Sequence, residues 1–356
     1  MLQRFAHVFG SVNYGTESSA CFTASRMAWL TNTGKFARPD MPAAKLFVGW
    51  GSATHYSRWN VANGVDAFKR RGGTVLCVDP RITPGVQRNA DLHLRVKPGT
   101  DGLLANCIAG IRNGWHDKAY IEKYVHGFEP YAAYVTALDV AETSRITGVP
   151  AADIEAAAHM IATIKPMSVE NNPTSIIHQT NGFQTARAIF ALTAITGNYN
   201  TPGNQPLDFT FCEQGAGFHT EDEEFAVERA PADFDTARIG AKRFPVWSRL
   251  VTQMQACDMA RQILEGEPYP VRAIYAHGMN HRIFTDPEYL VRAIDTLDFF
   301  VDVDLFLTDT AKLADVVLPA CSSFEREEFK VYPGGFEYEP HKAKIVLLQM
   351  QETVRN

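Results

Sequence analysis

Short apolar segments alternate with helical patterns along the first two hundred residues, and this alternation limits the chain to few folds. Four segments bounded by Gly, Pro or Asp are predicted to be β-strands, at residues 45–51, 73–80, 91–99 and 166–172. Helical patterns occur at residues 59–73, 101–113, 151–164 and 181–198. Strands that alternate with helices form a parallel sheet covered on both faces, so the sequence predicts an α/β fold.

A second group of strands follows a region without clear periodicity. Residues from about 204 to 245 are acidic and loop-like, and strand patterns return at 271–280, 299–308 and 314–320. The 356 residues, 46% of them hydrophobic, exceed the usual size of one domain. We therefore predict a Rossmann-like αβα parallel-sheet domain over residues 1–205, followed by part of a second, related αβα domain over residues 206–356.

The two regions share an internal repeat. Asp79 leads to Thr83 and Asp304 leads to Thr308, with four residues from Asp to Thr in both, and a glycine turn lies upstream of each pair. Such turns bring backbone N–H groups up to phosphates, and an acidic residue after the next strand can accept hydrogen bonds from a ribose. The repeat is typical of two nucleotide-binding halves, although any two βαβ units share much of this order.

Composition excludes several classes of function. A net charge of -6 gives no basic surface for a nucleic-acid backbone, and no apolar run is long enough for us to expect membrane insertion. The six cysteines are scattered without a CxxC pair, so neither a disulfide framework nor a self-contained zinc or iron–sulfur site is indicated. Any metal would use one of these cysteines singly.

The identity of the nucleotide depends on two short stretches. "KPGTD" puts Asp101 on a turn at the predicted sheet edge, where a carboxylate can pair with the N–H donors of guanine, although Asp101 also fits a helix N-cap. In "GWGSAT", Thr54 stands where the NAD fingerprint has its third Gly or Ala. An NAD-type dehydrogenase and a non-catalytic nucleotide-binding module both remain as alternatives.

Three long stretches, at residues 76–106, 178–203 and 299–329, resemble the molybdopterin oxidoreductases of the dimethyl sulfoxide reductase family. In that family two molybdopterin guanine dinucleotides hold one Mo or W ion through four dithiolene sulfurs. The resemblance implies cofactor-binding positions at Gly49, Ser52, Asp79, Arg81, Thr83, Thr100, Asp101, Gly278, Asn280, Asp304 and Thr308.

The resemblance also implies a metal ligand. Family members with a cysteine on the metal carry it just ahead of the first helix of this domain, where Cys21 stands, and thiolate is a soft ligand suited to such a metal. The alternative is a buried, unreactive cysteine. His178 could donate to cofactor or substrate, or could be structural, and His277 and His281 beside the second glycine turn carry the same two interpretations.

Family members commonly begin with a [4Fe-4S] segment and end with a β-barrel domain, and neither is expected within these residues. We therefore expect a central fragment of a two-electron oxidoreductase that acts on a small molecule. The parent enzyme could have an iron–sulfur electron-transfer subunit and could be cytoplasmic or periplasmic in a bacterium or archaeon. The incomplete second domain is expected to leave a sheet edge or an apolar face uncovered.

Overall fold

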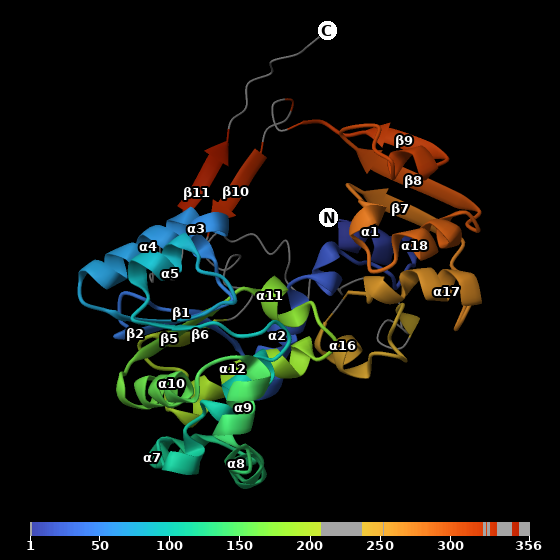
Figure 1. Cartoon of the computed structure of the whole chain (residues 1–356). Coiled ribbons are helices and arrows are strands. Elements are labelled where there is room, and N and C mark those ends of the chain that lie inside the picture. Colours follow the sequence, from blue (N-terminus) through green and yellow to red (C-terminus); the bar gives the residue numbers. More distant parts are fainter. Residues whose placement is uncertain are drawn as a thin grey trace. The chain divides into compact units, whose positions relative to one another are not determined.

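The computed structural model describes residues 2–207, 237–251, 253–322, 325, 328–332 and 344–348. The chain divides into two compact units (Figure 1). The four-stranded unit comprises Cys21–Phe209 with Gly334–Pro340, and the three-stranded unit comprises Met1–Ala20, Thr210–Pro333 and His341–Asn356. No helix in the described part of the chain has the length and apolar character needed to cross a membrane.

The four-stranded unit is built on the predicted parallel sheet. Its strands are β2 (Leu46–Trp50), β3 (Thr74–Val78), β4 (Leu92–Leu94) and β5 (Met167–Asn171), in the spatial order β4-β3-β2-β5. Trp50 lies opposite Val78 on one side and Asn171 on the other, so three strands end level with one another. The segments that follow these strands therefore meet at one sheet edge.

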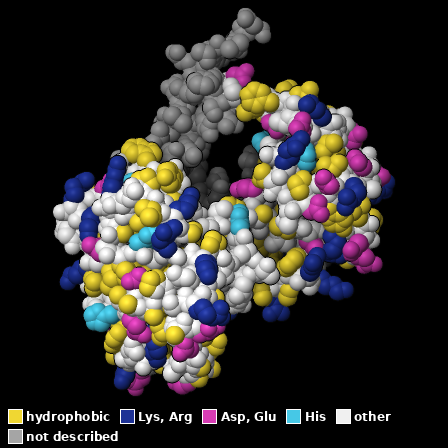
Figure 2. All heavy atoms as spheres, viewed as in Figure 1, with side chains coloured by type: hydrophobic (Ala, Val, Ile, Leu, Met, Phe, Trp, Pro, Cys, Tyr) yellow, Lys and Arg dark blue, Asp and Glu magenta, His cyan; other side chains and the backbone are white. Residues whose placement is uncertain are grey.

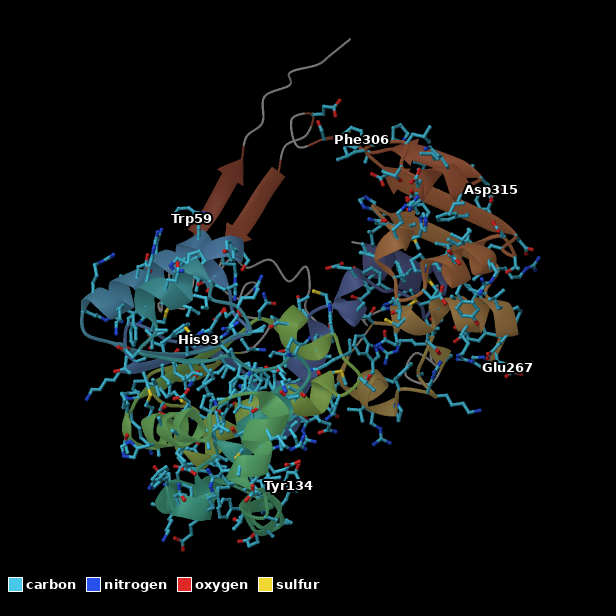
Figure 3. The ribbon with its side chains drawn as sticks, in the orientation of Figure 1. Trp59, His93, Tyr134, Glu267, Phe306 and Asp315 are labelled. Carbon is cyan, nitrogen blue, oxygen red and sulfur yellow. The ribbon has the colours of Figure 1, made fainter. Side chains whose placement is uncertain are left out.

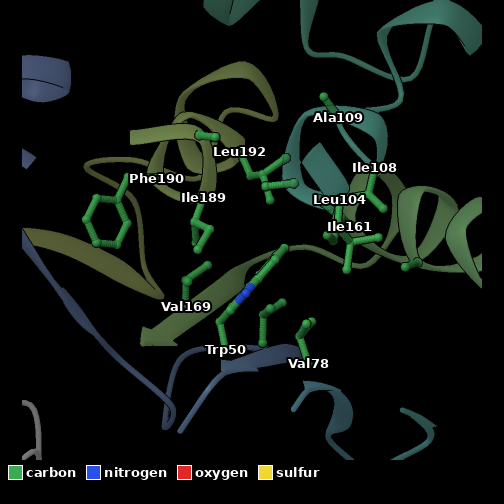
Figure 4. Close-up of a cluster of buried hydrophobic side chains, with 14 of the residues drawn as sticks. Trp50, Val78, Leu104, Ile108, Ala109, Ile161, Val169, Ile189, Phe190 and Leu192 are labelled. Carbon is green, nitrogen blue, oxygen red and sulfur yellow. The ribbon is translucent and has the colours of Figure 1, made fainter. Parts of the chain in front are cut away.

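Helices cover both faces of this sheet, as predicted. Alternate strand residues point to opposite faces: Phe47 and Val75 pack with α4 (Trp59–Arg70), whereas Trp50 and Val78 belong to the larger core on the other face. The larger core is formed with α2 (Thr23–Thr33), α6 (Asp101–Cys107), α10 (Ala151–Thr163) and α12 (Gly182–Ile195) (Figure 4). The αβα architecture is confirmed for this unit.

The remaining elements of the four-stranded unit are short. A two-stranded antiparallel pair, β1 (Phe36–Pro39) with β6 (Asn204–Leu207), was not predicted from the sequence. The helices are α3 (Thr54–Ser57), α5 (Pro84–Asn89), η2 (Ile111–Asn113), α7 (Lys118–Tyr124), α8 (Phe128–Thr136), α9 (Val140–Thr147) and α11 (Pro173–Ile177). The helix predicted over 101–113 is thus two elements, because Gly110 adopts a left-handed φ of 66° between them.

The three-stranded unit contains β7 (Ala273–His277), β8 (Phe299–Asp304) and β9 (Val316–Pro319), all parallel in that order. On one face Phe300 packs with residues of α17 (Met259–Glu265) and α18 (Pro287–Ile294). The short helices are α16 (Pro245–Leu250), η3 (Ala256–Asp258), η4 (His281–Ile283) and η5 (Ala311–Leu313), and β10 (Glu328–Tyr332) pairs with β11 (Lys344–Leu348). Most of the predicted loop at 204–245 lies outside the described residues.

The first twenty residues belong to the three-stranded unit, whereas the predicted division placed them with residues 21–205. They carry α1 (Leu2–Phe9) and η1 (Glu17–Ala20). The Phe5 ring lies 5.7 Å from that of Tyr275 on β7. The Asn13 side chain donates to Tyr269 Oη at 2.8 Å and accepts the backbone N–H of Ile239 at 2.9 Å. These contacts link the start of the chain to residues more than two hundred positions away.

Candidate functional site

The loop after β2 turns at Gly51, whereas the resemblance implied Gly49 as the loop glycine. Gly51 has a φ of 56°, and its N–H donates to the Val78 carbonyl at 2.7 Å. A Cβ atom at this position would lie 2.2 Å from Ser175 Oγ, so another residue here would strain the backbone and displace the Ser175 side chain. Gly49, predicted for this loop, lies instead inside β2, paired with Cys77. Ser52 follows, and its buried Oγ has no hydrogen-bond partner among the described residues.

The loop after β3 is organised around Asp79. This carboxylate is 5% exposed and accepts the Arg81 N–H at 2.8 Å, which tightens the turn. The Arg81 guanidinium itself is exposed, with Nε 3.5 Å from Asp79 Oδ1. Thr83 is buried and accepts the Val86 N–H at 3.3 Å, which makes it the N-cap of α5. The loop thus presents an exposed guanidinium beside a fixed carboxylate.

Asp101 points into the unit toward β2. Its Oδ1 accepts the Trp50 Nε1–H at 2.9 Å, and the residue is 6% exposed. Burial raises the pKa of Asp101, the charge of Asp79 raises it further, and the hydrogen bond from Trp50 opposes both effects. Thr100 precedes it at the start of α6, where its hydroxyl donates to the Lys97 carbonyl at 2.7 Å. The N-cap alternative for Asp101 is not realised, because Thr100 occupies that position.

Cys21 and His178 have few polar contacts. Cys21 is half-buried and stands two residues before α2 begins at Thr23, as the sequence predicted. His178 follows α11, is exposed, and forms no hydrogen bond with the described residues. Within the described ranges, no group of three or more His, Cys, Asp or Glu side chains is arranged to hold a metal ion.

The three-stranded unit has a similar loop arrangement at its own sheet edge. Gly278 follows β7 with a φ of 63°, and its N–H donates to the Val303 carbonyl at 2.8 Å. Asn280 accepts the Arg282 N–H at 3.0 Å. Asp304 ends β8 and accepts the Leu305 N–H at 2.6 Å, and Thr308 accepts the Ala311 N–H at 3.1 Å. These four predicted residues therefore shape two adjacent loops.

Three hydrogen bonds recur at the two sheet edges. Gly51 and Gly278 make the same backbone hydrogen bond, and Thr83 and Thr308 make the same capping bond. Each region also has an Ala-Asp pair before its third strand, Ala90-Asp91 and Ala314-Asp315, and these two aspartates correspond. Asp91 accepts the Val75 N–H, and Asp315 accepts the Phe300 N–H, both at 2.8 Å. These carboxylates tie the loop before the third strand to the start of the second strand in each sheet.

A buried carboxyl group distinguishes the second edge. Asp302 is fully buried in β8, and neither of its carboxylate oxygens has a hydrogen-bond partner among the described residues. Burial and the nearby charge of Asp304 raise its pKa. The equivalent position of the first sheet holds Cys77, whose thiol pKa is raised to about 12 by burial and by Asp79 and Asp91. The alternating "VDVD" at 301–304 was the only sequence signal for Asp302.

Two parallel sheets with similar glycine and Asp–Thr loops define an α/β protein, and this loop arrangement is typical of dinucleotide-binding folds. Residues 1–342 match the family model described as "Molybdopterin oxidoreductase". The chain therefore belongs to the molybdopterin oxidoreductase family. This membership confirms the predicted resemblance and gives no support to the NAD-type alternative.

The proteins to which this chain is similar are named for different activities. A probable oxidoreductase of Bacillus subtilis (strain 168), YoaE, is 29% identical over 344 residues, which cover 92% of this chain and 46% of YoaE. Formate dehydrogenase H of Escherichia coli (strain K12) is 29% identical over 290 residues, 78% of this chain and 39% of that protein. The structure of acetylene hydratase from Pelobacter acetylenicus superposes with a TM-score of 0.80 at 22% identity, over 94% of this chain and 48% of that one. The chain spans about half the length of the relatives it matches.

Proposed function

We propose that this chain is the central cofactor-binding part of a Mo or W oxidoreductase that holds two molybdopterin guanine dinucleotides, one at each sheet edge. The observation that carries the proposal is the set of three hydrogen bonds that recurs in the loops of both sheet edges. When bound, such a cofactor supplies a metal centre that exchanges two electrons with a substrate. The residues of this chain would bind and orient it.

The residues at the first edge fit a nucleotide with a diphosphate. Ser52 offers a buried hydroxyl whose hydrogen-bonding capacity is unused by the described residues, and a phosphate oxygen would satisfy it. Arg81 offers a planar donor fork for the same charge. Asp79 is fixed where a ribose could donate to it. The Asp101 carboxylate, oriented by its hydrogen bond from Trp50, could accept from the two N–H groups of a guanine.

The second edge offers the same kinds of groups in a different order. Gly278 gives close approach to the backbone, and Asn280 has an amide N–H₂ that remains a donor while its oxygen caps η4. Asp304 and Thr308 correspond to Asp79 and Thr83. These groups would hold the second dinucleotide.

Cys21 and His178 are assigned to the reacting end of the cofactor. A Cys21 thiolate would complete the set of soft sulfur ligands around the metal. The His178 imidazole, exposed and without a hydrogen bond to the described residues, could move a proton to or from a small substrate. The reaction class is a two-electron transfer at the oxygen-atom, hydroxyl or hydride level, consistent with relatives named as formate dehydrogenase and nitrate reductase.

Calorimetric titration with GDP and ADP tests the nucleotide assignment. We expect tighter binding of GDP, and we expect Asp101→Asn to weaken GDP by roughly 1 to 3 kcal/mol because one bidentate guanine contact is lost. Asp139→Asn is the matched control, since Asp139 is an exposed N-cap of α9 and Asn caps equally well. Equal affinity for the two nucleotides, unchanged by Asp101→Asn, would refute the assignment. Guanine binding without turnover in the longer parent enzyme would favour the non-catalytic module.

A further inference from the structure

We infer that two buried histidines, His55 and His281, are equivalent positioning residues, each fastening the glycine loop of its sheet edge to the Asp–Thr loop beside it. The inference deepens the proposed function and rests on it for the identity of the ligand. The fastening itself is a property of the chain alone. His55 was not recognised from the sequence, whereas His281 was predicted either to donate to cofactor or substrate or to be structural.

In the four-stranded unit, His55 comes four residues after Gly51 and is turned inward. Its side chain is 9% exposed, and Nε2 lies 2.9 Å from Asp66 Oδ1 on α4. The same carboxylate oxygen accepts from Asn89 Nδ2 at 2.6 Å, at the end of α5. Burial opposes ionisation of Asp66, but the hydrogen bonds from Asn89 and His55 outweigh it and lower the pKa of Asp66. One carboxylate therefore connects α3, α4 and α5.

The His55 ring also contacts the Asp–Thr loop directly. Gly85 lies two residues after Thr83, and a Cβ atom there would be 2.6 Å from His55 Nδ1. The ring thus fills the space that any side chain at position 85 would need. Movement of the loop after β2 must displace either the ring or the first turn of α5.

In the three-stranded unit, His281 takes the corresponding place three residues after Gly278. It is 7% exposed, and its backbone N–H donates to Thr310 Oγ1 at 3.2 Å. Its ring Nδ1 lies 3.0 Å from the same oxygen. Because that oxygen already accepts a backbone proton, the hydroxyl hydrogen is free to donate to an unprotonated Nδ1. Thr310 lies two residues after Thr308, as Gly85 does after Thr83.

The two contacts occupy the same place in the repeat but use different chemistry. One edge uses a histidine–aspartate pair with a glycine contact, and the other uses a histidine–threonine pair. A ligand that touches both loops of an edge pays less ordering entropy when their spacing is fixed beforehand. Both edges therefore meet the same requirement, a fixed spacing between the two loops that would hold one diphosphate.

Backbone hydrogen exchange of the wild-type chain and its variants tests the fastening without any ligand. We expect His55→Ala to raise exchange about tenfold or more at both 52–57 and 81–89, while the loops of the other unit stay unchanged. His281→Ala should do the same at 279–284 and 305–312. His55→Gln, which keeps an N–H donor for Asp66, should restore most of the protection. His159→Ala, which removes an exposed histidine of α10, is the control.

A double substitution tests the contact with Gly85. Gly85→Ala alone should loosen the loop after β2, whereas Gly85→Ala in the His55→Ala background should add nothing, because the ring it would strike is gone. Faster exchange confined to the loop that carries the histidine, or additive effects in the double variant, would overturn the inference.

GDP titration then connects the fastening to binding. We expect His55→Ala to lower the affinity for GDP about fivefold to tenfold, because the spacing of the two loops is no longer fixed before binding. His55→Gln should lower it about twofold or less. If the wild-type chain does not bind GDP, the proposed function fails while the exchange results still decide the fastening. If GDP binds equally to His55→Ala and wild type, the positioning role fails and the proposed function stands.

Discussion

Asp302 shows how a single buried group can reduce the stability of a unit. A carboxyl group taken out of water without a hydrogen-bond partner costs free energy, and a neutral side chain of similar shape does not. We expect Asp302→Val to raise the free energy of unfolding of the three-stranded unit by about 1–3 kcal/mol at pH 7. Urea denaturation, monitored by hydrogen exchange in β7, β8 and β9, measures this change in the free energy of unfolding.

The pH dependence of this stability difference tests whether the ionisation of buried Asp302 is its cause. The folded-state pKa of Asp302 lies above its unfolded value, so the cost of ionising it is present at neutral pH and is relieved as the pH falls through the folded pKa. The difference between Asp302→Val and wild type should therefore shrink in acid. Asp302→Asn, which removes the charge but leaves a polar group, should lie between them. A destabilised Asp302→Val at every pH would show that the carboxylate has a partner.

Cys21 allows a test in a longer enzyme that contains this chain. We expect Cys21→Ser to preserve folding but to change the absorption and EPR signals of the metal and to remove most turnover, because a harder oxygen replaces sulfur. Cys257→Ser is the control, since Cys257 is exposed in the other unit. Wild-type spectra and rates in Cys21→Ser would identify Cys21 as a structural residue.

At the scale of strands and helices, hydrophobic periodicity predicted the elements whose positions follow from the burial of apolar residues. The seven parallel strands were placed because each is a short apolar run between turn residues, and the parallel order follows from the intervening helices. Periodicity could not show that Gly110 would split a helix, nor that Gly51 rather than Gly49 makes the turn, because both depend on φ angles and close approaches. The β1–β6 pair joins segments far apart in sequence and left no local signal.

The candidate site was predicted to a similar extent. The two Asp–Thr loops were found from the repeat, because Asp-to-Thr spacing is visible in the sequence, and the other cofactor-binding positions followed from the family resemblance. The partners of these residues were not, since the Trp50–Asp101 hydrogen bond and the His55–Asp66 pair depend on tertiary packing. The sequence also could not show that residues 1–20 belong to the three-stranded unit, because the contacts that hold them there join residues more than two hundred positions apart.

The carboxylate of Asp91 predicts acid sensitivity at the β3–β4 side of the sheet. Burial opposes its ionisation, but hydrogen bonds from Lys69 and the Val75 N–H lower its pKa. A lowered folded pKa contributes stability above the unfolded value and loses it as the pH falls through the folded value. We expect exchange in β3 and β4 to rise below about pH 4. Asp91→Asn should show the faster exchange at pH 7 and little further change in acid.

Gly182 links α12 to the position of His178. A Cβ atom there would lie 2.4 Å from both the Cα and the carbonyl oxygen of Ile177, and backbone atoms cannot yield as a side chain can. We expect Gly182→Ala to cost about 1–3 kcal/mol and to displace the turn at 177–181. NMR shifts of the His178 imidazole report the displacement. Gly72→Ala is the control. A Cβ atom at Gly72 meets open space, so this substitution adds only the backbone strain of a φ of 89°, whereas Gly182→Ala adds a steric clash.

For the molecule as a whole, the uncovered apolar residues of the three-stranded unit predict association. Its core helices lie on one face of the sheet, while Tyr275, Phe299 and Leu318 are 50%, 45% and 42% exposed. Phe306, labelled in Figure 3, is 76% exposed in the loop after β8, and hydrophobic side chains are visible among charged ones on the surface in Figure 2. Several apolar side chains of this unit are therefore exposed in the part of the chain that the structure describes, while the Phe5 ring of α1 lies against Tyr275.

Light scattering after size exclusion tests the consequence. We expect the chain alone to form concentration-dependent oligomers, because exposed apolar patches favour contact between molecules. Phe306→Lys together with Leu318→Lys should reduce association, and Tyr134→Lys, at an exposed aromatic residue of the other unit, should not. A monomer at all concentrations would show that this surface is too small or too divided to drive association.

Metal content provides the last test at this scale. The four-stranded unit has a continuous core on both faces of its sheet, so the chain alone is expected to fold at least through this unit. In the proposed enzyme four sulfur ligands would come from two cofactors, and affinity for a metal depends on a preformed ligand set. Cys21 alone would be one thiolate, so we expect elemental analysis of the purified chain to find no stoichiometric Mo, W or iron. We also expect no redox activity. Loading with one equivalent of Mo or W in a compact monomer would contradict this expectation and would show that these residues suffice to assemble the centre.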